Sequence, residues 1–95
     1  MKQFLVIGLG RFGSSVAQTL YESGEEVLAI DINSELVQDK ISNKMIENGL
    51  ILDATDNKAL AELGVQEYDV AFVCTAEIEA SIMITLNLKE LGVKK

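Results

Sequence analysis

The chain has 95 residues, a net charge of −7, 48 % hydrophobic residues, one cysteine and no histidine. This length suits one small domain and leaves no room for a catalytic domain beside a cofactor domain. The acidic balance argues against a nucleic-acid partner, and a lone cysteine without histidine excludes a disulfide and the usual zinc and iron–sulfur ligand sets. No segment has the pattern of a signal peptide or a membrane span, so we expect a cytoplasmic protein.

Short apolar runs alternate with longer amphipathic segments along the chain. An apolar run that ends at a glycine predicts a strand buried on both faces, and a four-residue apolar spacing predicts a helix. Glycines close three of the helices, and side chains that cap helices begin two of them. In chain order, the sequence predicts strand 4–7, helix 11–23, strand 27–32, a helix from 33 or 34 through 41, a strand within 50–53, a helix from 56 or 57 through 63, strand 69–74 and helix 78–91.

Two helices carry the apolar residues that we expect to pack on the sheet. In the first helix Phe12, Val16 and Leu20 recur every four residues and predict one buried face. The last helix is apolar around much of its circumference, which favours a core position, with a subunit contact as the alternative. Its apolar residues are Ile82, Met83, Ile84, Leu86 and Leu88.

Alternating strands and helices predict an α/β fold, a Rossmann-like parallel sheet with helices on both faces. No linker interrupts the chain, so we expect residues 1–95 to form one domain. The tripeptide "LGV" occurs at 63–65, before a predicted strand, and again at 91–93, close to the last residue. We therefore expect a piece of a longer protein, truncated before or at a fifth strand.

The spacing of Gly8, Gly10 and Gly13 between a predicted strand and helix is typical of a dinucleotide-binding loop. Gly8 permits the sharp turn, Gly10 lets the backbone approach a pyrophosphate, and Gly13 lets the helix pack closely on the strand. The helix N-terminus then offers N–H groups to the phosphates. The alternative is a plain strand-to-helix turn.

Asp31 lies eighteen residues beyond Gly13, at the end of the second predicted strand. A carboxylate at this position accepts both ribose hydroxyls and repels a 2′-phosphate, which favours NAD or an adenosine nucleotide over NADP. The alternative is an acid that merely caps the next helix. Arg11 follows the second glycine, where its guanidinium reaches a phosphate or a neighbouring subunit, or is simply solvated.

Two further loops at the same edge of the sheet contain candidate binding residues. Asp53, Ala54 and Thr55 are candidates for the adenine side, although "DATD" equally reads as a turn with a helix cap. Thr75 and Ala76 follow the fourth predicted strand, where we expect them to pass under the ribose or the pyrophosphate.

The sequence contains no recognisable catalytic machinery. No histidine serves as a proton carrier, and neither Tyr21 nor Tyr68 begins the Tyr-x-x-x-Lys pair of short-chain dehydrogenases. Cys74 has no histidine partner and is interpreted as a small buried hydrophobe. The sequence therefore predicts a binding domain and not an enzyme.

Several segments together resemble the nucleotide-binding N-terminal part of RCK domains, the TrkA-N domain of Trk and Ktr potassium uptake systems. They are "FLVIGLGRFGSSVAQTL", "VLAIDIN", "DATD", "DVAFVC" and "EASIMITLNLKELGV". The resemblance implies a cytosolic regulatory subunit that binds NAD(H), ATP or ADP and assembles as dimers into rings. It also implies that the subunit gates a membrane potassium channel or transporter, on whose inner face it lies.

Carried onto this chain, the resemblance assigns the phosphates to Gly8, Gly10 and Gly13, with Arg11 on a phosphate of its own subunit or of the other subunit in a dimer. Asp31 takes the ribose, and the segment 53–55 approaches the adenine. Phe12 and Ile32, beside these residues, complete the expected site.

Three functions stay open at this point. A nucleotide-sensing regulator is favoured by the resemblance and by the missing acid–base groups. The cofactor-binding half of an NAD-dependent dehydrogenase is the alternative, and a nucleotide-independent scaffold is the third.

Overall fold

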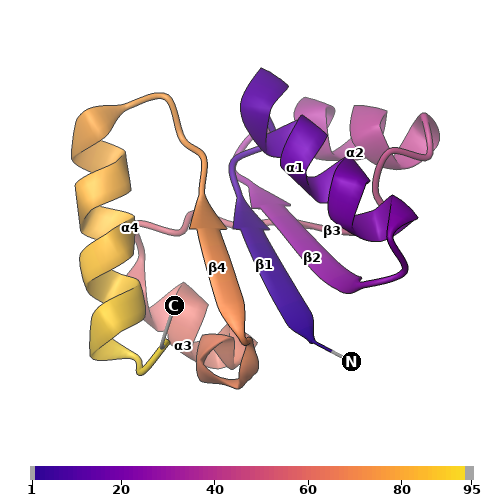
Figure 1. Cartoon of the computed structure of the whole chain (residues 1–95). Helices are drawn as coiled ribbons and strands as arrows, with labels where there is room; N and C mark the ends of the chain where they lie inside the picture. Colours follow the sequence, from indigo (N-terminus) through magenta and orange to yellow (C-terminus); the bar gives the residue numbers. More distant parts are fainter. Residues whose placement is uncertain (1, 94–95) are drawn as a thin grey trace.

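A computed structural model describes residues 2–93 of the chain, in which strands and helices alternate (Figure 1). The elements start and stop close to the predicted positions, with the largest shift at the third strand. In chain order they are β1 (Gln3–Ile7), α1 (Arg11–Glu22), β2 (Glu26–Asp31), α2 (Ser34–Ser42), β3 (Asn48–Ile51), α3 (Asn57–Leu63), the short 3-10 helix η1 (Val65–Glu67), β4 (Val70–Val73) and α4 (Ile78–Glu90).

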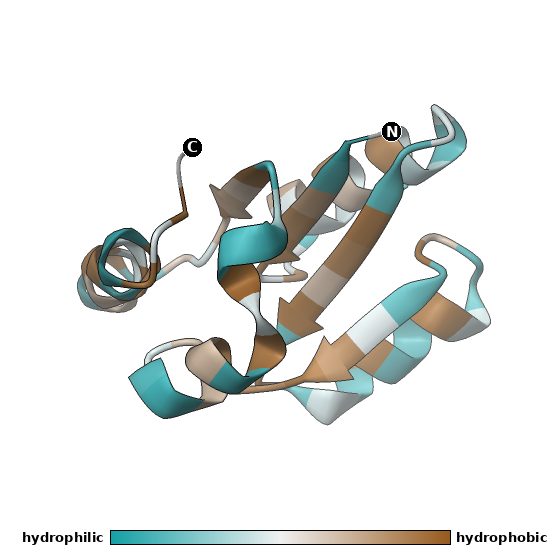
Figure 2. Ribbon diagram, turned by 90° about the horizontal axis from the view of Figure 1, so that it is seen from below, coloured by the Kyte–Doolittle hydropathy of each residue, from teal (hydrophilic) through white to brown (hydrophobic). Residues whose placement is uncertain are grey.

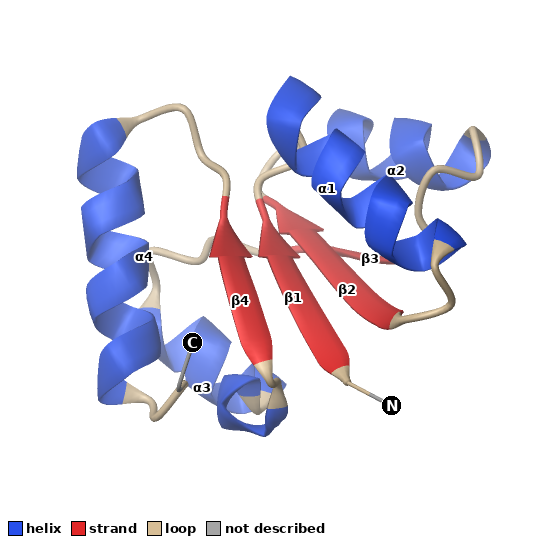
Figure 3. Ribbon diagram, viewed as in Figure 1, coloured by secondary structure: helices blue, strands red, loops and turns tan. Residues whose placement is uncertain are grey.

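The four described strands form one parallel sheet in the order β3-β2-β1-β4. The first strand lies inside the sheet: Leu5 pairs with Leu28 of β2 and with Ala71 of β4. Helices α1 and α2 cover one face, and α3 and α4 cover the other (Figure 3). The predicted parallel sheet with helices on both faces is confirmed.

Alternate residues of each central strand enter two separate core clusters. In β1, Leu5 packs with α3 and α4, whereas its neighbour Val6 packs with α1 and α2. This alternation explains why the central strands are continuous apolar runs, because both of their faces are covered. Figure 2 shows the hydrophobic residues concentrated along the strands, between the helical layers.

Side-chain caps and glycines set the helix boundaries. The side chain of Asn33, and not of Ser34, caps α2 by accepting from the N–H groups of Glu35 and Leu36. Asp56 caps α3 in the same way. Gly64 then ends α3 in the left-handed conformation, with φ of 76°.

Three sequence predictions are wrong in position or burial. The third strand is Asn48–Ile51 and not 50–53. Its position was hard to predict because it is an edge strand, whose side chains are largely exposed and whose apolar pattern is weak. Phe12 is 70 % exposed, since α1 packs through Gly13, Ser14 and Ala17 instead. In α4 the buried apolar residues are Ile84 and Leu88, while Ile82, Met83 and Leu86 are half exposed. The expectation that the chain stops before or at a fifth strand concerns residues 94–95, which lie outside the described residues.

Candidate functional site

Gly8 turns the chain sharply out of β1. Its φ is +104°, and a Cβ atom there would lie 2.8 Å from the carbonyl oxygen of Cys74 at the end of β4. The Gly8 N–H donates to the carbonyl of Ile30 at 2.8 Å, so the turn stays joined to β2. The fold itself therefore requires glycine at this position.

Gly13 lets the start of α1 lie directly against the end of β1. A Cβ atom at this position would come within 1.7 Å of the carbonyl oxygen of Gly8. The predicted close packing of helix and strand is confirmed.

Gly10 differs from both, because nothing in the described chain requires it to be glycine. A Cβ atom there would meet no heavy atom within 4 Å. Its φ is −68°, which any residue adopts. An open position beside a helix N-terminus is where a pyrophosphate approaches the backbone in dinucleotide-binding loops, so the loop fits such a group.

The first turn of α1 is electrostatically open to an anion. No side chain caps this helix, and its first turn contains no acidic residue. The N–H groups of a first turn have no intrahelical partners and carry partial positive charge. Arg11 and Phe12 begin the helix, and both are exposed to solvent. Among the described residues Arg11 takes part in no ion pair, which leaves its guanidinium free for a phosphate.

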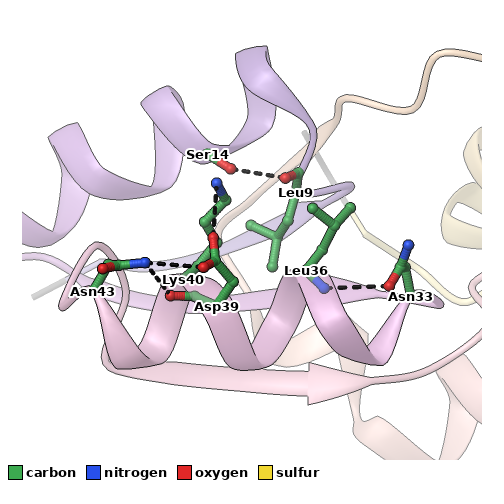
Figure 4. A network of polar contacts seen from close by, with 7 residues as sticks. All are labelled: Leu9, Ser14, Asn33, Leu36, Asp39, Lys40 and Asn43. Carbon is green, nitrogen blue, oxygen red and sulfur yellow. Dashed lines mark hydrogen bonds and ion pairs between the residues drawn. The ribbon is translucent and has the colours of Figure 1, made fainter.

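Hydrogen bonds hold the glycine loop in shape. The buried Ser14 hydroxyl donates to the Leu9 carbonyl at 2.8 Å (Figure 4). The Leu9 N–H donates to Oδ2 of Asp31 at 2.6 Å. These two hydrogen bonds, made within the chain itself, fix the path of the loop backbone.

Asp31 connects the ends of β1 and β2. Besides Leu9, it accepts the N–H of Asn33 on Oδ1 at 2.8 Å. Each carboxylate oxygen has two lone pairs, so both oxygens keep an acceptor position for a hydroxyl group. The next residue, Ile32, is exposed and supplies an apolar surface beside this carboxylate.

The loop after β3 has the structure of a turn followed by a helix cap. Oδ1 of Asp53 accepts from the N–H of Thr55 at 3.0 Å and from its hydroxyl at 2.6 Å. These two donors, the hydroxyl first, lower the pKa of Asp53. Ala54 is buried in the core, so its side chain shapes the loop and is not a surface for a ligand. The expectation that the segment 53–55 approaches the adenine stays a prediction.

The loop after β4 passes beside the glycine turn. Thr75 is half buried and hydrogen-bonds through its hydroxyl to Ser81 of α4, whereas Ala76 is exposed. Cys74 is half buried, and burial raises the pKa of its thiol. A raised pKa disfavours the nucleophilic thiolate, in agreement with the interpretation of Cys74 as a small hydrophobe.

The four strands bring the predicted loops to one edge of the sheet. Figure 3 shows the arrowheads of β1, β2 and β4 directed to the same edge. Backbone hydrogen bonds join these ends, for example from Cys74 to Ile7 at 2.8 Å and from Leu52 to Asp31 at 3.1 Å. The glycine loop, Asp31, the Asp53–Thr55 turn and Thr75 are thus neighbours on one rim, the usual place for ligands in open parallel sheets.

Sequence reasoning missed two polar residues that support this rim. Asn87 and Ser81 lie on the inner side of α4, where Asn87 bonds to the loop after β3 and Ser81 to the loop after β4. Their one signal in the sequence is that both are polar residues of the otherwise largely apolar run "SIMITLNL", which Ser81 begins and Asn87 interrupts.

Two other kinds of site find no support in the described residues. Within 2–93, no three histidine, cysteine, aspartate or glutamate side chains are grouped in a way that holds a metal ion. None of the helices in this part of the chain has the length and apolar character needed to cross a membrane.

Residues 4–95 match the TrkA-N domain family. The chain belongs to this family. The match covers both the glycine loop and α4, and it confirms the family that the sequence motifs resemble.

Several relatives of this TrkA-N domain are potassium uptake proteins. It is 46 % identical over 93 residues to the Ktr system potassium uptake protein C of Bacillus subtilis, covering 97 % of this chain and 41 % of that protein. It is 42 % identical over 94 residues to the Ktr system potassium uptake protein A of Vibrio alginolyticus, covering 98 % of this chain and 42 % of that protein. The chain thus spans less than half the length of these relatives.

A solved structure confirms the Rossmann-like fold. The NAD(P)-binding domain of an exopolyphosphatase-related protein from Archaeoglobus fulgidus superposes on this TrkA-N domain with a TM-score of 0.84 and 21 % identity. The superposition covers 97 % of this chain and 68 % of that one.

Proposed function

We propose that this TrkA-N domain binds an adenine nucleotide and regulates a potassium uptake system. The observation that carries the proposal is Gly10, whose missing side chain is explained neither by its backbone nor by any neighbouring atom of residues 2–93. A pyrophosphate lying against this backbone, at the uncapped N-terminus of α1, accounts for it.

Each part of the nucleotide has a partner on the rim. The phosphates contact the loop from Gly8 to Gly13, with the guanidinium of Arg11 on one of them. Asp31 accepts the ribose hydroxyls and disfavours NADP, because a 2′-phosphate would meet a carboxylate. This chemistry suits NAD(H), ATP and ADP, which share an adenosine ribose and a phosphate chain.

The remaining rim residues surround the base and the ribose. Ile32 and the turn formed by Asp53 and Thr55 border the adenine, and Ala54 fixes that turn from the core. Thr75 and Ala76 lie beneath the sugar or the phosphates.

The relatives named above support a biological role in potassium uptake. We infer that the domain lies at the cytoplasmic face of the cell membrane as part of a regulatory subunit. Copies of the subunit associate as dimers and rings and pass a nucleotide-dependent change to a membrane potassium transporter. Such regulation needs no chemistry on the nucleotide, only different affinities of the ligand for two states of the assembly. The exposed apolar residues of α4 supply a surface for association.

A dehydrogenase half-domain is the weaker candidate. The chain contains no histidine, and burial raises the pKa of the Cys74 thiol, which disfavours the nucleophilic thiolate. The enzymes with this fold resemble the chain in fold alone, whereas its relatives by sequence are potassium uptake proteins.

Calorimetric titration of the purified chain with NADH, NAD, ATP, ADP and NADPH at one fixed salt concentration tests the proposal. We expect one or more adenine nucleotides to bind and NADPH to bind more weakly than NADH. If a folded chain binds none of them, the proposal is wrong.

A further inference from the structure

Asn87 is a polar residue in the buried side of α4. It is 8 % exposed and lies between Leu86 and Leu88 in sequence. Its Nδ2 donates to the carbonyl oxygens of Ala54 at 3.3 Å and Thr55 at 3.1 Å. An amide in an apolar helix face is costly unless it is satisfied, and here both donor bonds go to one loop.

That loop connects β3 to α3 and crosses the sheet to reach α4 (Figure 3). Its central residue, Ala54, packs in the same core cluster as Ile84 and Leu88 of α4. The loop is therefore held by α4 in two ways, through the buried methyl group of Ala54 and through the amide of Asn87.

The amide also has a defined orientation. Its Oδ1 accepts from Nδ2 of Asn57, the first residue of α3, at 3.4 Å. With the oxygen directed at this donor, the NH₂ group faces the two carbonyls. A side chain of the same shape that presents a second oxygen there would repel both of them.

Ser81 holds the next loop in a similar way. Its hydroxyl donates to the carbonyl of Thr75 at 3.3 Å and hydrogen-bonds to the Thr75 hydroxyl. Two of the four loops on the rim are thus attached to α4 by side-chain hydrogen bonds. Of the two attachments, that of Asn87 reaches the loop expected to border the base.

We propose that Asn87 is a positioning residue for nucleotide binding, which fixes the Asp53–Thr55 turn so that it accepts the adenine base. This inference rests on the proposed function. Asn87 does not touch the ligand. It acts through the carbonyls of residues 54 and 55, so its loss affects recognition of the base more than recognition of the phosphates.

The test compares Asn87→Asp with wild type and with Ile84→Val. The aspartate keeps the shape of the side chain and replaces the donor with an acceptor. Ile84→Val is the matched control, because it weakens the same buried face of α4 without touching a hydrogen bond of the loop. Asn87→Leu, which keeps the volume and removes the polar group, serves if the aspartate variant does not fold.

Two measurements are made on each full chain: affinity for ADP and for UDP by calorimetry, and amide hydrogen exchange of residues 53–57. We expect Asn87→Asp to bind ADP about tenfold more weakly, to lose less affinity for UDP, and to exchange faster in the loop. Ile84→Val should keep the wild-type ratio of ADP affinity to UDP affinity. Amide exchange of residues 53–57 should rise in this variant only as far as its lower free energy of unfolding explains.

The outcomes separate this inference from the proposed function. If wild type binds ADP and Asn87→Asp keeps the wild-type preference for ADP over UDP, the positioning role is wrong and the proposed function stands. If both substitutions change nucleotide affinity and amide exchange in proportion to the free energy of unfolding that each one loses, Asn87 has only a structural role and the proposal is wrong. If wild type binds no nucleotide at all, the proposed function fails together with the role of Asn87 in binding.

Discussion

The three glycines of the first loop have different physical reasons for their lack of a side chain. At Gly8 and Gly13 a Cβ atom would collide with backbone, whereas at Gly10 it would enter open space. Substitutions at these sites therefore separate the needs of the fold from the needs of a ligand.

We expect Gly10→Val to fold like wild type and to lose adenine-nucleotide binding, because its side chain occupies the approach to the α1 N-terminus. Gly13→Ala, the control, should fail to fold or be severely destabilised, since its methyl group would overlap the Gly8 carbonyl. Circular dichroism and calorimetric titration check both variants. Nucleotide binding at wild-type affinity by Gly10→Val would contradict the assignment of the phosphate site.

Asp31 is a second residue at which binding can be measured directly. We expect Asp31→Ala to weaken adenine-nucleotide binding by about 1–3 kcal/mol, through the lost ribose hydrogen bonds and the freed Leu9 N–H. Asp69→Ala is a matched control, because Asp69 also accepts a backbone N–H, from Gln3 at 2.7 Å. Asp69 lies where β4 begins, at the end of the strands away from the rim. Equal affinities of the two variants would remove Asp31 from the site.

Asp53 contributes a pH dependence to stability. Its pKa is below the ordinary 3.8, so its contribution is present above pH 3.8 and is lost as the pH falls through the lowered value. We expect the free energy of unfolding, measured with urea, to decrease less in Asp53→Asn than in wild type when the pH is lowered from about 6 to about 3. Thr55→Val, which removes the main donor, should behave in the same direction. An unchanged acid sensitivity in both variants would contradict the hydrogen-bonded turn.

At the scale of elements, α4 has two dissimilar sides. Ile84 and Leu88 pack on the sheet, Ser81 and Asn87 bond to loops, and Ile82 lies on the outer side. The apolar composition of the helix is therefore not a measure of its burial.

Matched truncations in α4 test this division. We expect Ile84→Ala to lower the free energy of unfolding by about 2–5 kcal/mol, because it leaves a cavity in the core. Ile82→Ala should cost well under half as much in a dilute sample, since Ile82 is 55 % exposed. Urea unfolding at low concentration measures both. Similar losses would mean that the outer side of α4 is covered in solution.

The elements also show which features the sequence determines locally. Apolar runs ending at glycine predicted β1 and the loop after it, because a central strand and its turn depend on adjacent residues. The exposure of Phe12 and Ile82 could not be predicted, since helical periodicity marks apolar positions without showing which of them meet the sheet. The hydrogen bonds of Asn87 could not be predicted either, because the two carbonyls that it contacts are more than thirty residues away in sequence.

At the scale of the whole molecule, the rim joins all four described strands, since each contributes the loop that follows it. A nucleotide on this rim would contact both halves of the chain at once. Binding should therefore stabilise the domain as a unit and not one loop alone.

We expect ADP at about one hundred times its dissociation constant to raise the free energy of unfolding by about 2.7 kcal/mol. A series of thermal or urea unfolding curves at increasing ADP concentration gives the value, with Gly10→Val as the variant that should show no increase. Calorimetric binding without stabilisation would mean that the ligand also binds the unfolded chain.

The exposure of Phe12 makes this position suitable for a fluorescent probe of the site. The chain contains no tryptophan, so an indole introduced by Phe12→Trp would be its sole emitter of that kind. The side chain stands in the first turn of α1 and is 70 % exposed, so the exchange displaces no core atom. The wavelength of its fluorescence emission would shift when a bound ligand removes water from the helix N-terminus. Nucleotide binding could therefore be followed in real time.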